Sequence, residues 1–185
     1  CLWTWTNTVT ATAQGPTGRT FTYSWSASPS GTVTPNNTSS VSVSLPTPTS
    51  GNQLYTVTVV ATDQFGCTAT YSDTATVWAR PNSSFTVTNT TCDSTTVSPV
   101  DGSTSGLTNA GLVYQWTLAR GQDTLSLSQI ANPQFLLRNR GVVDSTYTIF
   151  LIVSNGQSCP DTTSQTITVH PDAKVTLNLG STSAC

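Results

Sequence analysis

The sequence has few charged residues and lacks glutamate and methionine altogether. Only 8% of its 185 residues are Lys, Arg, Asp or Glu, the net charge is −2, and the single histidine is His170. Because the chain has no basic stripe, nucleic acid is not an expected partner. No apolar run approaches the roughly 18 residues of a membrane-spanning helix, so we expect no membrane span in this sequence.

Residues suited to catalysis or metal binding are equally scarce. A nucleophilic triad needs a base beside the nucleophile, and His170 precedes Pro171 in what we expect to be a solvated linker. The eight acidic residues are all Asp, and no two are spaced as a facing pair for glycoside hydrolysis. Calcium needs several oxygen ligands, and the only candidates, both weak, are Asp63 near Asp73 and Asp144 in its loop. We therefore expect no catalytic residue, no metal site and no cofactor, and we expect the chain not to be an enzyme.

Residues that suit β-sheets are plentiful. Thr and Val recur with five Trp, five Tyr and five Phe, a composition that favours packed, pleated surfaces over disorder. Apolar residues alternate with a period of two, and no stretch has the 3.6-residue period of a helix. The alternating pair Trp3 and Trp5 is expected to face a core rather than to bind sugar. The sequence therefore predicts an all-β protein.

The sequence repeats with a period near 92 residues. Cys1, Cys92 and Cys185 are 91 and 93 residues apart, and Cys67 and Cys159 are 92 apart. A shared period of this length predicts two tandem copies of one domain.

Four aromatic residues keep the same phase. Trp25 and Trp116 each lie 24 residues after one of these cysteines, and Tyr55 and Tyr147 each lie 12 residues before another. In immunoglobulin-type sandwiches a Trp on the third strand sits in the core, and a Tyr opening the penultimate strand can hydrogen-bond back across a corner. We expect these roles for the two Trp and the two Tyr residues.

The prolines Pro81 and Pro171 set the module boundaries, because each opens a similar apolar segment. We expect residues 1–80 to be a module lacking its first strand, 81–170 to be a complete module, and 171–185 to be the first strand of a further module, so that the chain is an internal fragment. Either this last strand continues into the next module of one polypeptide, which we favour, or it is donated to the next subunit. The apolar residues of the two equivalent strands are Phe85, Val87, Val175 and Leu177.

About seven short strands in some 90 residues predict tandem immunoglobulin-like β-sandwiches stacked end to end. The strands expected in module one are 2–11, 20–27, 40–45, 55–62 and 74–78. Those expected in module two are 83–90, 95–100, 112–119, 124–128, 134–138, 147–154 and 165–169.

Three motifs carry a family resemblance. Each motif occurs twice: Tyr23-Ser24-Trp25 is repeated at 114–116, the stretch 55–67 at 147–159, and the stretch 74–77 at 166–169. This pattern resembles a PKD-type module. The pair Gly66-Cys67 is similar to PKD-like repeats of giant surface proteins of Bacteroidota, including gliding-motility adhesins and cargo of the type IX secretion system. The resemblance implies an extracellular, surface-displayed structural module and not an activity. The expected partners are neighbouring copies of the same repeat, with surface glycans as the weaker candidate.

Five cysteines in such a chain indicate oxidation outside the cytoplasm. We favour a Cys1–Cys159 disulfide between modules, because Cys92 and Cys159 should lie at opposite ends of one module, about 23 Å apart at ~3.3 Å per residue. The alternative pairs Cys1 with Cys67 and Cys92 with Cys159, leaving Cys185 for the next module.

The expected function is a structural repeat of an extracellular filament, stalk or adhesin that disulfides make rigid. The alternative is a carbohydrate-binding or spacer module of a secreted enzyme.

Overall fold

The computed structural model describes residues 4–88, 90–108, 111–178 and 180. Within these ranges the secondary structure consists of fifteen β-strands and no helix, which confirms the predicted all-β class. It follows that no described segment is a helix long and apolar enough to cross a membrane.

The chain forms two compact units. Unit 1 comprises Cys1–Asn82, Thr104–Leu112 and Ser154–Asp161, and unit 2 comprises Ser83–Ser103, Val113–Val153 and Thr162–Cys185. The chain thus first passes from one unit to the other after Asn82, close to the predicted module boundary at residue 80, and later segments contribute to both units.

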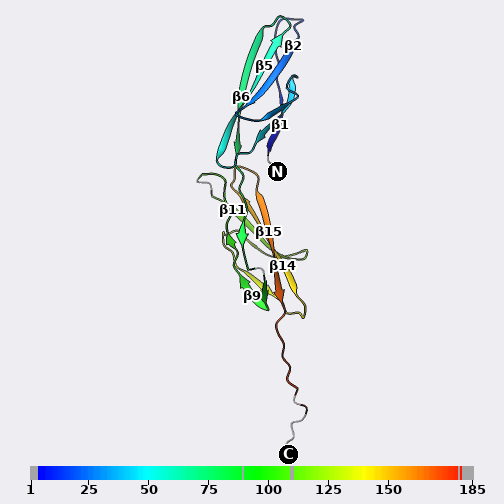
Figure 1. Cartoon of the computed structure of the whole chain (residues 1–185), viewed down its shortest axis with the longest axis vertical. Helices are drawn as coiled ribbons and strands as arrows, with labels where there is room; N and C mark the ends of the chain where they lie inside the picture. The colour runs from blue at the N-terminus through cyan, green and yellow to red at the C-terminus, as the bar shows by residue number, and fades with distance from the viewer. Residues whose placement is uncertain (1–3, 89, 109–110, 179, 181–185) are drawn as a thin grey trace, which may run out of the picture. The chain divides into compact units, whose positions relative to one another are not determined.

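Unit 1 contains two three-stranded antiparallel sheets (Figure 1). One has the order β1 (Thr4–Thr10), β4 (Ser40–Pro46), β3 (Thr32–Thr34). The other has the order β2 (Phe21–Ser28), β5 (Asn52–Asp63), β6 (Thr68–Trp78).

Alternate apolar residues on these strands form one core. Val41, Val43 and Leu45 of β4 are almost fully buried and cluster with Trp25 of β2 and Val59 of β5. Because successive side chains of a strand point to opposite faces, β4 buries alternate apolar residues and leaves Ser on its outer face, whereas the edge strands β1 and β6 are largely exposed.

Two loop segments from later in the chain complete unit 1. The Asn155 side chain is buried and donates hydrogen bonds to the carbonyl oxygens of Ala79 (3.0 Å) and Ser105 (2.7 Å). Next to Ser105, Gly106 has a φ of +71°, and a Cβ atom there would lie 2.4 Å from the carbonyl oxygen of Arg80. This position therefore requires glycine.

Unit 2 has one large sheet and two small ones. The five-stranded sheet has the order β12 (Asp123–Ser128), β11 (Val113–Arg120), β14 (Ser145–Ser154), β15 (Asp161–His170), β8 (Thr90–Cys92). The two-stranded sheets pair β7 (Phe85–Thr86) with β10 (Val100–Asp101), and β9 (Ser94–Val97) with β13 (Phe135–Arg138).

The core of unit 2 is centred on Trp116, whose side chain is fully buried. The ring of Phe85 meets the indole edge to face, with centroids 5.0 Å apart and planes at 73°. Phe135, Leu137 and Ile149 are also almost fully buried, so aromatic and aliphatic side chains from the four strands β7, β11, β13 and β14 exclude water from this region.

The first strand of module two differs from the prediction. We expected one strand over 83–90, but the chain forms β7, which pairs antiparallel with β10, and then β8, which pairs parallel with β15. The segment changes sheets between them, because a strand at the side of a two-layer structure can satisfy its backbone groups on either layer.

Three further expectations are corrected by the structure. Strand β6 begins at Thr68 rather than at residue 74. The prediction was too short because the first half of the strand is exposed on both faces and carries no alternating apolar signal. Trp5 is 38% exposed rather than a core residue, and Trp3 lies outside the described residues. His170 is the last residue of β15 rather than part of a loop, and its carbonyl oxygen accepts a hydrogen bond from the Asp93 N–H over 2.9 Å.

Candidate functional site: an apolar groove in unit 1

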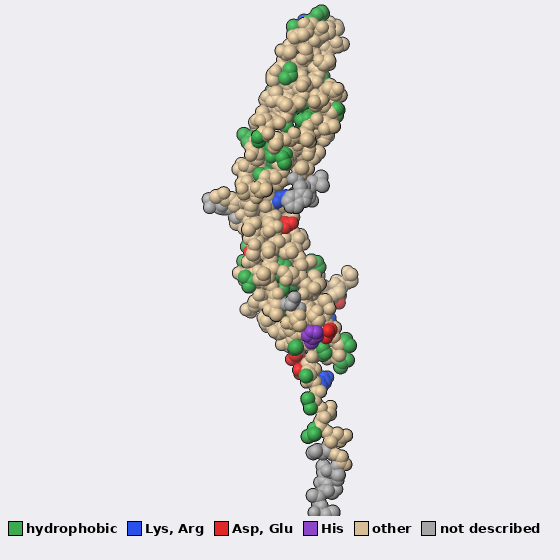
Figure 2. Space-filling view, viewed as in Figure 1, with side chains coloured by type: hydrophobic (Ala, Val, Ile, Leu, Met, Phe, Trp, Pro, Cys, Tyr) green, Lys and Arg blue, Asp and Glu red, His purple; other side chains and the backbone are tan. Residues whose placement is uncertain are grey.

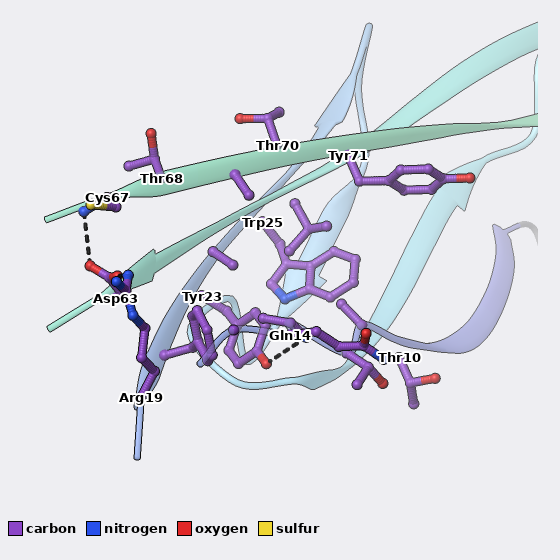
Figure 3. A pocket seen from close by; sticks show the side chains of 18 of the residues that line it. Thr10, Gln14, Arg19, Tyr23, Trp25, Asp63, Cys67, Thr68, Thr70 and Tyr71 are labelled. Carbon is purple, nitrogen blue, oxygen red and sulfur yellow. Dashed lines mark hydrogen bonds and ion pairs between the residues drawn. The ribbon is translucent and has the colours of Figure 1, made fainter. Parts of the chain in front are cut away.

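A groove of about 650 Å³ opens beside Trp25 in unit 1 (Figure 3). Its floor comes from β2 and β5, where Tyr23 is paired with Ala61 and Trp25 with Val59 across the ladder. These four residues occupy alternate positions of their strands and therefore project from the same face of the sheet. The floor is consequently apolar and aromatic.

The sides of the groove are two strands at the edges of their sheets. Val9 and Thr10 line it from β1, and Thr70, Tyr71 and Asp73 line it from β6. In the part of the chain that the structure describes, β1 and β6 each have a partner strand on one side only. An edge strand presents unpaired N–H and C=O groups, so the groove is bordered by free backbone hydrogen-bonding capacity.

The aromatic side chains of the floor are held by hydrogen bonds to loops. The indole Nε1 of Trp25 donates to the carbonyl oxygen of Thr38 over 2.8 Å. The hydroxyl oxygen of Tyr23 accepts a hydrogen bond from the backbone N–H of Ala13 over 3.4 Å. Both rings therefore have fixed positions at the base of the groove.

The end of the groove near Cys67 carries the buried carboxylate of Asp63. Its Oδ1 accepts hydrogen bonds from the N–H groups of Phe65 and Cys67, both over 2.9 Å, and its Oδ2 forms an ion pair with Arg19. Burial by itself raises the pKa of this carboxyl group, but the two backbone donors and the Arg19 guanidinium outweigh it and hold the pKa below 3.8. Asp63 is therefore an ionised anchor of the β5–β6 turn.

Comparisons with known proteins give no family. No known protein family and no curated protein matches this chain. Among solved structures, it is similar to Drosophila OTK, extracellular domains 3–5, with 14% identity over 91% of this chain and 56% of that one and a TM-score of 0.41.

A second solved structure is an endo-fucoidan hydrolase from glycoside hydrolase family 107. The match has 16% identity, covers 85% of this chain and 24% of that one, and has a TM-score of 0.30. The chain thus spans just over half of one matched structure and about a quarter of the other. Both similarities are distant.

The predicted aromatic residues lie in the two cores. Trp25 is 7% exposed and Trp116 is fully buried. Tyr55 donates a hydrogen bond to the carbonyl oxygen of Pro46 over 2.7 Å, and Tyr147 donates one to that of Arg138 over 2.6 Å. In both units the tyrosine thus reaches back nine residues along the chain.

The cysteine pairing is only partly described. Cys67 and Cys92 are exposed free thiols, so the alternative pairs Cys1–Cys67 and Cys92–Cys159 are not formed. Cys159 is the one described cysteine that is not a free thiol. Its favoured partner Cys1 lies outside the described residues, as does Cys185, and the Cys1–Cys159 disulfide stays a prediction.

The two equivalent first-strand segments are placed differently. Phe85 is buried and Val87 is half-buried in unit 2. Val175 and Leu177 are 96% and 81% exposed, and residues 171–178 belong to no strand.

The nearest arrangement to a catalytic pair is on the surface. His170 Nδ1 lies 2.8 Å from Asp144 Oδ1, and both side chains are about half exposed. The described residues contain no group of three or more His, Cys, Asp or Glu that could hold a metal ion.

Sequence reasoning missed the groove and its Asp63 anchor. One signal was available, because Asp63 and Asn155 are 92 residues apart and each Oδ1 accepts hydrogen bonds from the next few backbone N–H groups. The repeat thus marks a turn-anchoring position that composition alone does not reveal.

Proposed function

We propose that this chain is a structural repeat unit of an extracellular filament, stalk or adhesin, built from PKD-type immunoglobulin-like sandwiches in series. The observation that carries the proposal is the repetition of one supporting framework. A Trp stands in the core of each unit, at Trp25 and Trp116, and a buried Tyr in each unit, Tyr55 or Tyr147, reaches back nine residues to a carbonyl oxygen.

The β-ladders support a mechanical role. Strands β5 and β6 pair over the whole register from Asn52 opposite Trp78 to Thr62 opposite Thr68. A long ladder resists extension because many backbone hydrogen bonds must be broken for the strands to part.

The surface supports the same role. Figure 2 shows a surface made largely of uncharged polar side chains and backbone, with few Lys, Arg or Asp side chains. Such a surface suits passive display outside the cell, and the proposal assigns no catalysis to the chain. It includes the Cys1–Cys159 disulfide, which would link the segment Ser154–Asp161 to the start of the chain and so make the structure more rigid.

Immunogold electron microscopy of intact source cells tests the proposal, with antibodies raised against the 185-residue chain. We expect gold particles along surface fibres without permeabilisation. Labelling that requires permeabilised cells, with none on the surface, would refute an extracellular structural role.

A second candidate, carbohydrate binding, is favoured by one observation. Trp5 and Trp78 are 38% and 37% exposed and line a further cavity of about 430 Å³ in unit 1, together with Thr76 and Gln157. Aromatic faces beside hydrogen-bonding groups are suited to sugar rings.

A glycan array probed with the labelled chain tests this candidate. We expect any genuine glycan signal to be lost in Trp78→Ala, with Tyr71→Ala as the control for an exposed aromatic residue away from this cavity. A signal that survives Trp78→Ala would exclude the cavity as the sugar site.

A further inference from the structure

The groove of unit 1 corresponds to a filled position in unit 2. In unit 2 the ring of Phe85, from the short strand β7, covers the indole of Trp116. In unit 1 the equivalent indole, Trp25, lines the open groove. The two units therefore differ in whether a first strand covers the core Trp.

The edge strands show the same difference. Thr90, Thr91 and Cys92 of β8 pair in parallel with Thr168, Val169 and His170 at the edge of β15. Strand β15 is the repeat of β6, because Cys159 and Cys67 are 92 residues apart. The outer edge of β6 has no partner among the described residues, whereas the equivalent edge of β15 is paired with β8.

The chain also carries an unpaired segment of the matching type. Phe85 lies four residues after Pro81 and Val175 lies four residues after Pro171; Val87 and Leu177 each follow two residues later. Val175 and Leu177 are almost fully exposed in an extended segment with no strand partner. Two apolar side chains at alternate positions of an extended segment are suited to insertion into an apolar groove.

We propose that the groove of unit 1 binds residues 171–178 of a second copy of this chain as an added β-strand. This inference deepens the proposed function, on which it rests, by naming the partner through which successive units join. It takes strand donation, the alternative to the covalent continuation that the sequence favours, because the structure shows both an open groove and an unpaired segment of matching type. Val175 covers Trp25 as Phe85 covers Trp116, and Leu177 follows it along the groove.

The repeat defines the register of the added strand. Phe85 pairs with Asp101 in the β7–β10 ladder, and Thr10 is 91 residues before Asp101, the same spacing as Cys1 to Cys92. Val175 of the second copy therefore lies opposite Thr10, which lines the groove.

A charge pair accompanies this register. The Gln165 side chain donates a hydrogen bond to the carbonyl oxygen of Phe85, and the equivalent position in unit 1 is Asp73, which lines the groove. A carboxylate accepts and does not donate, so it cannot repeat the Gln165 contact. It instead meets the ammonium group of Lys174, the residue immediately before Val175.

The groove and the segment 171–178 are different surfaces of the 185-residue chain, so the contact joins unlike surfaces of two copies. Such a head-to-tail contact generates open chains unless the rotation between copies closes a ring. Self-association therefore increases with protein concentration and has no fixed endpoint.

Sedimentation velocity of the intact 185-residue chain over a wide concentration range tests the inference. We expect species larger than the monomer to grow with concentration. The double variant Val175→Ser and Leu177→Ser should weaken association more than tenfold, because it removes the apolar anchors from an exposed segment that the fold does not need. The matched control, Thr176→Ser and Asn178→Ser, alters the two intervening residues and should associate like the unmodified chain.

A synthetic peptide of residues 171–178 provides a second measurement. Calorimetry should show binding to the intact chain, and the peptide carrying both Ser substitutions should not bind. Lys174→Asp should weaken association roughly two- to fivefold, and combining it with Asp73→Lys should restore it, as for an exposed ion pair.

Three results would overturn the inference. They are a chain that stays monomeric, a peptide that does not bind, and association that persists in the double Ser variant. These outcomes are independent of surface labelling on cells, so a failure of strand docking and a failure of the proposed extracellular role are distinguishable.

Discussion

The hydroxyl group of Tyr147 donates a hydrogen bond to the carbonyl oxygen of Arg138 over 2.6 Å, and the backbone N–H of Arg138 lies 3.3 Å from the same hydroxyl oxygen. The backbone N–H and C=O groups of Arg138 are thus both satisfied by the side chain of Tyr147, which is only 3% exposed. This contact joins the end of β13 to β14 and fixes the crossing between them.

Replacing Tyr147 with Phe should lower the free energy of unfolding by about 1–3 kcal/mol, because it leaves the polar groups of Arg138 without their partner. Urea denaturation followed by circular dichroism measures the change. Tyr71→Phe is the control, since Tyr71 is 70% exposed, and it should leave stability unchanged. Equal stability of Tyr147→Phe and the unmodified chain would show that the hydrogen bond contributes nothing.

Phe85→Ala should destabilise unit 2 by about 3–5 kcal/mol, since it removes the ring that covers Trp116 and leaves a cavity. The equivalent substitution Val175→Ala should leave the unfolding of the monomer unchanged, because that side chain is 96% exposed. Denaturation at a concentration low enough for the monomer compares the two variants. A destabilised Val175→Ala monomer would mean that the segment packs within its own chain.

Asp63→Asn should reduce the sensitivity of unit 1 to acid. The pKa of the Asp63 carboxyl group is held below 3.8 in the folded state, so its contribution to stability is fully present above pH 3.8 and is lost as pH falls through the lower folded value. The amide keeps an oxygen acceptor for the Phe65 and Cys67 N–H groups, as Asn155 does in its own turn, but cannot form the ion pair with Arg19.

The measurement is the unfolding midpoint as a function of pH. The variant should be less stable near neutral pH and should lose less stability on acidification below pH 3.8. Asp73→Asn removes an exposed carboxyl group instead and serves as the control. If both variants followed the acid profile of the unmodified chain, the Asp63 ion pair would have no measurable effect.

Gly106→Ala should destabilise unit 1 by at least about 1–2 kcal/mol. Alanine at a φ of +71° is strained, and its Cβ would also collide with the carbonyl oxygen of Arg80. Gly111→Ala is the matched control, since a Cβ atom there meets nothing within 4 Å. Thermal unfolding of the two variants compares them, and equal melting temperatures would contradict the expected clash.

Alkylation of the native, unreduced protein should label Cys67 and Cys92, because both are exposed free thiols. Non-reducing peptide mapping should then give a linked peptide containing Cys1 and Cys159. A linked Cys1–Cys67 or Cys92–Cys159 peptide would refute the inter-module disulfide and the described thiols together.

The sequence allowed the strands with clear alternation to be predicted, and with them the core Trp and Tyr residues. Strand β4 buries alternate positions Val41, Val43 and Leu45, and a period-two signal of this kind is visible without a structure. The first half of β6 was missed because its Thr and Ser residues are exposed on both faces, and only hydrogen bonding to β5 defines it as a strand.

The groove could not be predicted, because it depends on which edge of each sheet stays unpaired. The repeat placed Trp25 and Trp116 in equivalent positions, and the expected lack of a first strand in residues 1–80 already indicated that no such strand covers Trp25. Only the structure shows that the edge strands β1 and β6 both line the groove beside this indole. The division of the segment after Pro81 into β7 and β8 has the same origin, since pairing with β10 or β15 is decided by residues far along the chain.

Because ionisable side chains are scarce, the stability of the fold should depend little on the salt concentration of the surrounding medium. At low to moderate concentration, dissolved salt acts on a protein mainly by screening its charges, and here the charged residues make up only 8% of the chain. Ion pairs contribute little to stability, so the hydrogen-bonded ladders and apolar cores hold the fold together whether these charges are screened or not. The same contacts therefore stabilise the fold in dilute and in moderately concentrated electrolyte.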